Sequence, residues 1–245
     1  MSGDSTTKVI AHRGASADHP ENTRDAFIGA AEQGADWVEL DVRHTRDGSL
    51  IVHHDAWYHD ERIVWSTPSH ERPEALLDLE AALESCLDGS HTHGRSLGVN
   101  IEIKNMAGDL GGDHVPRSLE VVHAVLSVLG SRSERGVHEE ILISSFDPET
   151  IDLVRELDGP PTAQLVVDLN SWPDVVESTA GRGHSHVHPW DPFVDELFLE
   201  SAWNAGLGVN TWTVDDPARI AELARMGVDG IVTNVPRTAR QVIDA

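Results

Sequence analysis

Short apolar runs alternate along the chain with longer segments whose apolar residues recur at helical spacing. Nine runs rich in Val and Ile predict strands: Lys8–Ala11, Trp37–Val42, Leu50–His54, Gly98–Ile103, Ile141–Ser145, Gln164–Val167, Ser185–His188, Gly208–Val214 and Gly230–Thr233. Six segments predict helices: Asn22–Gln33, Leu77–Cys86, Arg117–Leu129, Pro148–Leu157, Pro192–Ala205 and Pro217–Met226. Strands that alternate with helices predict a mostly parallel sheet covered on both faces.

The number of strands favours a closed barrel with one extra strand. Eight strands make a TIM (β/α)8 barrel, and the ninth fits if the run ending at His54 returns from a hairpin above the barrel. A doubly wound open sheet is the alternative, but its glycine-rich phosphate turn is missing. We therefore expect residues 1–245 to form a single-domain α/β TIM barrel, with a hairpin and a short insertion (about 56–76) at the C-terminal mouth.

The hairpin is predicted from the segment VELDVRHTRDGSLIVHHD, residues 38–55. Asp-Gly between two apolar runs is typical of a type I′ turn, in which both central residues have positive φ. If Asp47 and Gly48 are those residues, paired positions sum to 95, and Asp41 lies opposite His54. Glu39 shares that face because side chains alternate along a strand. Acids and a histidine would then converge on one spot, whereas the plain alternative is a solvated hairpin face.

Polar residues recur where the predicted strands end, and in a barrel these ends meet at one mouth. Glu39, Asp41 and Glu102 are three hard oxygen ligands, which suit Mg²⁺ or Ca²⁺, with Mn²⁺ as a third candidate, better than zinc. A single divalent cation would also relieve the repulsion among three crowded carboxylates.

Cations and histidines accompany these acids. Arg13 and Lys104 suit an anionic substrate, above all a phosphate. Lys104 is notable because the chain contains only two lysines against sixteen arginines. His12 and His54 are candidates for a general acid and a general base near neutral pH. Together the set predicts metal-assisted cleavage of a phosphoester.

Eight short motifs, in order along the chain, resemble those of the glycerophosphodiester phosphodiesterases. They are HRG at 12–14, PENT at 20–23, ELD at 39–41, HHD at 53–55, EIK at 102–104, SSF at 144–146, WTV at 212–214 and GVDGIVTN at 227–234. The resemblance runs from residue 9 to about 236 and implies a TIM barrel. It also implies hydrolysis of glycerophosphodiesters, such as glycerophosphocholine or glycerophosphoethanolamine, to glycerol 3-phosphate and an alcohol.

The resemblance assigns a role to each matching position. His12 and His54 match the acid/base pair, and the three acids match the metal ligands. Arg13 and Lys104 match phosphate-binding cations, while Phe146 and Trp212 match apolar walls of the substrate cleft. The chain departs from the family in its compact 55–77 segment, and in Thr233-Asn234, where Thr-Asp is frequent.

Two other functions stay open at this point. One is a phosphodiesterase acting on a larger lipid, of the lysophospholipase D or phosphatidylinositol phospholipase type; the acidic composition argues against it. The other is a non-catalytic glycerophosphate-binding barrel, which would not need two histidines.

His184, His186 and His188 alternate and could share one face, but surface histidines at a strand end are favoured over a soft-metal site. We expect His53 to be structural, because its neighbour His54 faces the opposite way.

Composition bounds partners and location. A net charge of −24 should repel nucleic acid and anionic membranes, so we expect a small-molecule substrate and no stable membrane association. The single cysteine excludes an intrachain disulfide. The first residues resemble no signal peptide and no long apolar run occurs, so we expect a cytoplasmic protein. The oligomeric state is left open.

The charge of −24 also motivates the hypothesis of a halophilic source, because concentrated salt screens repulsion between surface acids. We predict that the protein unfolds more readily as salt is withdrawn. Thermal denaturation from molar to millimolar salt measures this, and undiminished folding and activity at low ionic strength would contradict the hypothesis.

Overall fold

The computed structural model describes residues 7–87, 96–105, 114–134, 140–167 and 172–245. Within the described part of the chain, no helix is long and apolar enough to cross a membrane.

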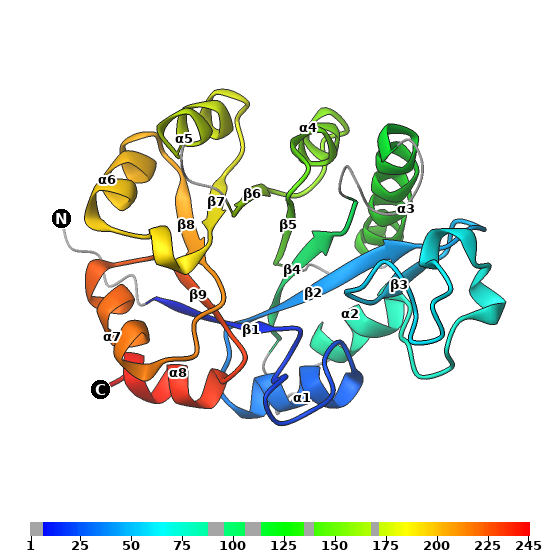
Figure 1. Cartoon of the computed structure of the whole chain (residues 1–245), viewed down its shortest axis with the longest axis horizontal. Helices are drawn as coiled ribbons and strands as arrows, with labels where there is room; N and C mark the ends of the chain where they lie inside the picture. Colours follow the sequence, from blue (N-terminus) through cyan, green and yellow to red (C-terminus); the bar gives the residue numbers. More distant parts are fainter. Residues whose placement is uncertain (1–6, 88–95, 106–113, 135–139, 168–171) are drawn as a thin grey trace.

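Eight parallel strands close into a barrel (Figure 1). They are β1 (Lys8–His12), β2 (Trp37–His44), β4 (Gly98–Ile103), β5 (Ile141–Ser145), β6 (Thr162–Val166), β7 (His186–Pro189), β8 (Gly208–Thr211) and β9 (Gly230–Thr233), and a ninth strand, β3 (Leu50–Val52), pairs antiparallel with β2 outside the ring. The order runs β1-β9-β8-β7-β6-β5-β4-β2, and pairing of β1 with β2 closes the ring. All nine predicted strands are confirmed to within a few residues, and so is the TIM barrel.

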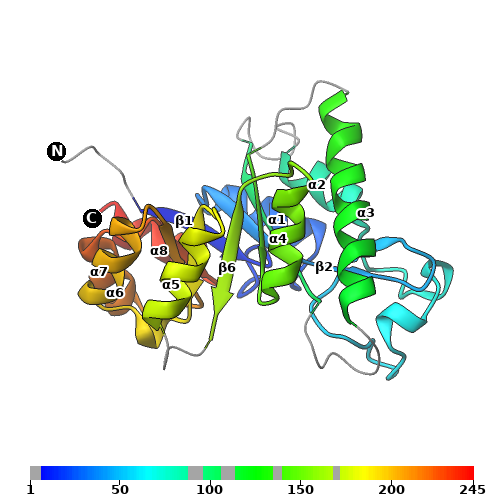
Figure 2. The same ribbon diagram turned by 90° about the horizontal axis from the view of Figure 1, so that it is seen from above.

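The helices stand outside the strands, as Figures 1 and 2 show. They are α1 (Arg24–Glu32), α2 (Leu79–Leu87), α3 (His114–Glu134), α4 (Pro148–Glu156), α5 (Trp172–Gly181), α6 (Glu196–Asn204), α7 (Pro217–Met226) and α8 (Pro236–Ile243). Short 3₁₀ turns occur at Val64–Ser66, Ser69–Glu71 and Asp191–Phe193. Helices α5 and α8 are additional to the six predicted.

Helix starts follow the capping signals in the sequence. Asp147 accepts a hydrogen bond from the Thr150 backbone N–H and precedes a proline in the first turn of α4. Asp216 does the same for α7. The predicted helix 192–205 is divided, because Asp195 caps α6 and separates it from the preceding 3₁₀ turn. An acceptor at the N-cap satisfies backbone donors that a helix otherwise leaves open.

The hairpin forms, but the predicted register is wrong by one residue. Strand β3 pairs antiparallel with β2 through Val42–Val52 and His44–Leu50, so paired numbers sum to 94. Gly48 has φ of 84°, but Asp47 is not among the positive-φ residues, so the type I′ turn is absent. The Thr45 N–H donates to Ser49 and the Gly48 N–H to Thr45, which makes a three-residue loop with glycine in the left-handed position. A loop of three residues in place of two changes the sum of every pair of opposed residue numbers from 95 to 94, so every predicted pair is off by one residue.

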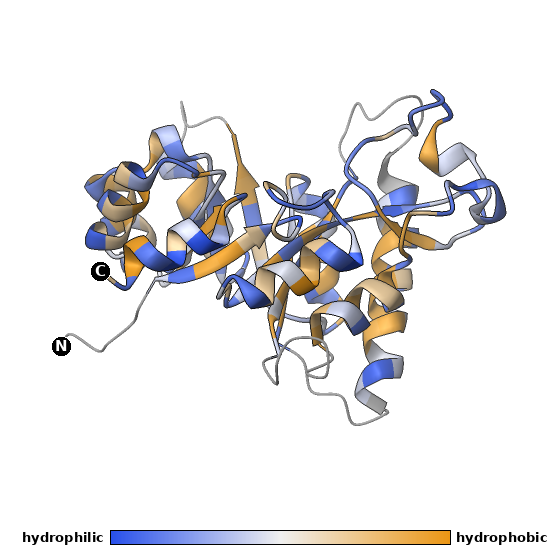
Figure 3. Cartoon of the chain, turned by 90° about the horizontal axis from the view of Figure 1, so that it is seen from below, coloured by the Kyte–Doolittle hydropathy of each residue, from blue (hydrophilic) through white to orange (hydrophobic). Residues whose placement is uncertain are grey.

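The core lies inside the barrel and between the strands and helices. Strands β2, β4 and β9 are buried over most or all of their length, as expected when both faces of a parallel sheet are covered. In Figure 3 the strands are mainly hydrophobic, whereas the helices alternate between hydrophobic and hydrophilic residues. The 56–76 segment projects beyond the ring, on the side of β2 and α3 (Figures 1 and 2). Its Tyr58 and Val64 pack with Ile51 of β3 in a small cluster separate from the main core.

Candidate active site

A cavity of about 390 Å³ opens at the C-terminal mouth of the barrel. Eight of the nine predicted site residues line it: His12, Arg13, Glu39, His54, Glu102, Lys104, Phe146 and Trp212. The ninth, Asp41, is fully buried and contacts both cations of the set. The structure therefore brings all nine predicted residues together, from six different strands or the loops that follow them.

The three acids meet because of strand alternation and register. Glu39 and Asp41 are two apart on β2 and share a face, and Asp41 lies directly beside Glu102 of β4 in the parallel pairing. One oxygen from each of the three carboxylates lies within 4.8 Å of the others, and all three residues are buried. Among the described residues, this is the one such group of possible metal ligands.

Two cations compensate the charge of the acids. Lys104 Nζ lies 2.6 Å from Glu102 Oε1 and 3.2 Å from Asp41 Oδ1. Arg13 Nε lies 3.1 Å from Asp41 Oδ2, and the Arg13 backbone N–H donates to Glu39 Oε2 at 3.0 Å. Buried charges require such partners, because the interior solvates ions poorly.

Compensation is uneven across the three carboxyls. Burial raises the pKa of Glu39 well above its usual range, and the neighbouring Asp41 and Glu102 raise it further. Burial likewise raises the pKa of Glu102. Burial opposes the ionisation of Asp41 as well, but Lys104 and Arg13 outweigh it and lower its pKa to about 2.

The arrangement fits a divalent cation. Glu39 Oε1 is buried, and no hydrogen bond or ion pair reaches it within the described part of the chain. An unpartnered carboxylate oxygen facing two further carboxylates is a donor set for a hard ion such as Mg²⁺ or Ca²⁺. Bound positive charge would also favour the ionised form of Glu39, which burial disfavours.

Two residues that the sequence did not assign to the site support these groups. Asn22 Nδ2 donates to Asp41 Oδ2 at 2.9 Å; the helix that was predicted to begin at Asn22 begins instead at Arg24, with Thr23 as its N-cap. Arg43 of β2 donates to the backbone oxygen of His54 at 2.8 Å and to that of Lys104 at 3.4 Å. Asn22 and Arg13 both adopt positive φ, near 58°, a backbone conformation that is uncommon for non-glycine residues.

Each predicted acid/base histidine is held through Nδ1. His12 Nδ1 lies 2.8 Å from Asn234 Oδ1, and His54 Nδ1 lies 2.8 Å from Asp55 Oδ1. Because these oxygens accept, each Nδ1 carries the proton and each Nε2 keeps its lone pair. Burial lowers the pKa of both histidines, and the nearby cations Arg13 and Lys104 lower it further.

His54 reaches the cavity although the register that placed it there is wrong. The His53 backbone N–H, rather than a group of His54, pairs with the Asp41 backbone oxygen. Strand β3 ends at Val52, so His54 lies past the ladder and lines the cavity. The His53 ring instead lies 3.1 Å from the Trp57 oxygen and packs near Tyr58.

Aromatic rings form one wall of the cavity. Phe146 and Trp212 meet edge to face, with ring centroids 5.5 Å apart at 85°. Lys104 Nζ lies 5.9 Å from the Phe146 ring centroid, within range of a cation–π contact. Trp212 Nε1 donates to the His188 backbone oxygen at 2.8 Å, which fixes the indole.

The histidine trio does not gather into a ligand set, and the expectation of surface histidines is also wrong, because His184 and His188 are buried. His184 precedes β7 and contacts Thr162 and Asp152, 2.8 and 3.1 Å away. His188 is buried and accepts from Asn210, while His186 contacts Ser185.

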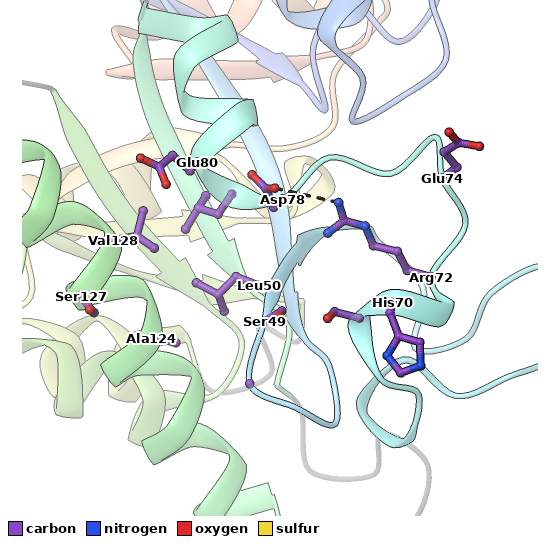
Figure 4. A pocket seen from close by; sticks show the side chains of 13 residues that line it. Ser49, Leu50, His70, Arg72, Glu74, Asp78, Glu80, Ala124, Ser127 and Val128 are labelled. Atoms are coloured by element: carbon purple, nitrogen blue, oxygen red, sulfur yellow. Dashed lines mark ion pairs between the residues drawn. The ribbon is translucent and has the colours of Figure 1, made fainter.

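A second cavity is larger than the one at the mouth, at about 880 Å³ (Figure 4). It lies between the hairpin turn, the start of α2 and α3, and Arg72 points across it toward Asp78, 3.9 Å away. None of the nine predicted residues lines it. Size alone therefore does not locate the site, whereas the convergence of acids, cations and histidines does.

A closed (β/α)8 barrel with its charged residues at the C-terminal mouth is the architecture of a TIM-barrel enzyme. The chain belongs to the glycerophosphoryl diester phosphodiesterase family, whose model matches residues 12–238. A protein of Mycobacterium tuberculosis named as a probable glycerophosphodiester phosphodiesterase is 60% identical over 259 residues, covering 93% of this chain and 89% of that one. The glycerophosphodiester phosphodiesterase of Caldanaerobacter subterraneus is 29% identical over 245 residues, covering 95% and 96%.

A solved structure agrees with this assignment. The crystal structure of a glycerophosphodiester phosphodiesterase from Thermotoga maritima superposes with a TM-score of 0.77 at 25% identity, covering 96% of this chain and 98% of that one. The protein is thus a phosphodiesterase whose family hydrolyses glycerophosphodiesters, as the motifs predicted.

The unusual position of Glu39 gives a stability prediction for the protein kept free of metal by a chelator. A carboxyl whose pKa is raised on folding destabilises the folded state once pH exceeds its ordinary pKa, and the loss grows until the raised pKa is reached. Glu39→Gln removes that loss and keeps an acceptor for the Arg13 N–H. We expect a gain on the order of 1 kcal/mol in unfolding free energy at neutral pH, shrinking in acid.

Urea denaturation at several pH values measures the gain, with the exposed Glu74→Gln as a charge-matched control. Equal stability of Glu39→Gln and wild type at neutral pH would mean that folding does not raise the pKa of Glu39.

Proposed function

We propose that this phosphodiesterase acts on small glycerophosphodiesters, such as glycerophosphocholine or glycerophosphoethanolamine, and releases glycerol 3-phosphate and the alcohol. The observation that carries the proposal is the convergence in one cavity of three acids, two cations and two histidines. A charged diester of this size suits a cavity of about 390 Å³. Family membership favours an enzyme over a non-catalytic binding barrel.

Glu39, Asp41 and Glu102 would hold one divalent cation, Mg²⁺ or Ca²⁺, with Mn²⁺ as a third candidate. Such an ion, when bound, supplies Lewis-acid stabilisation of negative charge on phosphate oxygens. Arg13 and Lys104 add fixed positive charge at the same place, so phosphate binding does not rest on the ion alone. Their own contacts with Asp41 hold them in position before substrate arrives.

His12 and His54 would move the protons. One Nε2 accepts the proton of the attacking hydroxyl, which belongs either to water or to the substrate's own glycerol. The other histidine would enter the step as the imidazolium, and its Nε2–H would give its proton to the leaving oxygen. Their lowered pKa values favour the neutral form at pH 7, which is the form needed in the base. Phe146 and Trp212 would bind the apolar part of the substrate.

The test is to replace each of the two histidines and to compare the loss of activity with that of a control variant at a neighbouring histidine outside the cavity. We predict that His54→Ala and His12→Ala each lower kcat for glycerol 3-phosphate release by about 10²–10⁴-fold, the usual contribution of a general acid or base. His53→Ala is the matched control, because the His53 ring contacts Trp57 and Tyr58 instead of the cavity. It should retain near-wild-type kcat.

The affinity for metal distinguishes the loss of a proton-transferring group from damage to the metal site. Calorimetric titration with Mg²⁺ or Ca²⁺ should give the same affinity for His54→Ala as for wild type, and a much weaker one for Glu102→Gln. Near-wild-type turnover of His54→Ala would remove that residue from the mechanism. Equal losses in His53→Ala and His54→Ala would show that the loop, rather than one imidazole, is what matters.

A further inference from the structure

His12 is the one proposed acid/base group whose Nδ1 partner is an amide instead of a carboxylate. That partner is Asn234, directly after β9, whose Oδ1 lies 2.8 Å from His12 Nδ1. An amide side chain offers an acceptor at one end and a donor at the other, so it can hold an imidazole in either tautomer. Which end faces His12 therefore decides whether Nε2 carries a lone pair or a proton.

Asp215, in the loop after β8, is in contact with the other end of that amide. Asn234 Nδ2 donates to Asp215 Oδ2 at 2.7 Å, and the Asn234 backbone N–H donates to Asp215 Oδ1 at 2.8 Å. Thr233 Oγ1 also donates to Oδ1, at 2.9 Å. An ionised carboxylate only accepts, so it holds the NH₂ group toward itself and turns Oδ1 toward His12.

We propose that Asp215 is a positioning residue that fixes the tautomer of His12 through Asn234. The chain of contacts runs from the β8 loop through β9 to the end of β1, so it spans neighbouring strands of the closed barrel. Ser16 Oγ lies 2.9 Å from the same Asn234 oxygen and supports its orientation. This extends the proposed function, because a His12 with its lone pair on Nε2 is useful only if His12 moves a proton.

Asp215→Asn should reverse the orientation of the Asn234 amide and, with it, the tautomer of His12. The new amide keeps its oxygen on the two donors Thr233 Oγ1 and the Asn234 N–H, so its NH₂ group faces Asn234. Asn234 then turns its own oxygen outward and presents NH₂ to His12. His12 Nδ1 must become the acceptor, and the proton moves to Nε2, where it occupies the position facing the cavity.

The double variant Asp215→Asn/Asn234→Asp should restore the wild-type tautomer of His12. Its amide donates to the carboxylate at 234, and that carboxylate accepts from His12 Nδ1–H as the wild-type amide does. Asn234→Asp alone should fail, because two carboxylates would face each other across the 2.7 Å contact. Both positions lie toward the surface, so the substitutions leave the core intact.

The matched control is Asp216→Asn, one residue away. Asp216 is the exposed N-cap of α7, and Asn caps a helix as well as Asp does. It removes the same charge from the same loop without touching Asn234. We expect no change in its kcat.

The experiment reads the tautomer directly, by ¹⁵N NMR of the histidine rings at about pH 8, where imidazole is neutral. The His12 signals are those missing from His12→Asn. We predict Nδ1–H in wild type, Nε2–H in Asp215→Asn and Nδ1–H again in the double variant. In parallel, kcat should fall at least about tenfold in Asp215→Asn with little change in KM, and recover in the double variant.

An Asp215→Asn protein that keeps Nδ1–H would overturn the proposal, as would a double variant that stays inactive with the wrong tautomer. The tautomer is measured without substrate. If it switches as predicted but wild type releases no glycerol 3-phosphate, the proposed substrate fails and the positioning role stands.

Discussion

The structure depends on holding three carboxylates together in a place that water hardly reaches. Unrelieved, Glu39, Asp41 and Glu102 would repel one another and resist ionisation, and the raised pKa of Glu39 shows that this tension persists. Lys104 and Arg13 outweigh it at Asp41, whereas the pKa of Glu102 stays raised in spite of its contact with Lys104. Within the described part of the chain, Glu39 Oε1 is buried without a hydrogen-bond or ion-pair partner, and this open acceptor is the physical reason to expect a cation.

The barrel makes that concentration of charge achievable. Parallel register sets Asp41 beside Glu102, strand alternation adds Glu39, and the closing β1–β2 pair brings His12 alongside Glu39. Strand β2 continues past its pairing with β1, which ends at Glu39, and β3 pairs with that extension. The hairpin thus brings His54 to the cavity that holds the acids. The Arg43 side chain fixes this position by donating hydrogen bonds to the backbone oxygens of both His54 and Lys104. Each functional group rests on a strand or on a loop tied to one.

Much of this was predictable, because the signals are local. Strand ends rich in polar residues point to one mouth in any parallel barrel, so the seven charged and histidine residues of the site could be grouped without coordinates. The family resemblance added Phe146 and Trp212. Helix α5 was missed because Val175, Val176 and Thr179 are weak helix formers and the segment lacks a strong apolar period. Helix α8 is short and largely polar.

What the sequence could not provide is geometry that depends on one bond or one turn. The hairpin register depends on whether the turn holds two or three residues, and Asp-Gly fits both. Asn22 reads as a helix-start residue until the loop folds back onto Asp41. The contact between Asp215 and Asn234 joins loops 19 residues apart in a way no spacing rule encodes.

The central claim is that the buried acids hold a divalent ion needed for cleavage. Its most direct test is release of glycerol 3-phosphate from glycerophosphocholine by chelator-treated enzyme in high salt, before and after adding Mg²⁺, Ca²⁺ or Mn²⁺. We predict no release with chelator and recovery with at least one of these ions. Full activity in the presence of chelator, from folded protein shown to be free of metal, would contradict it.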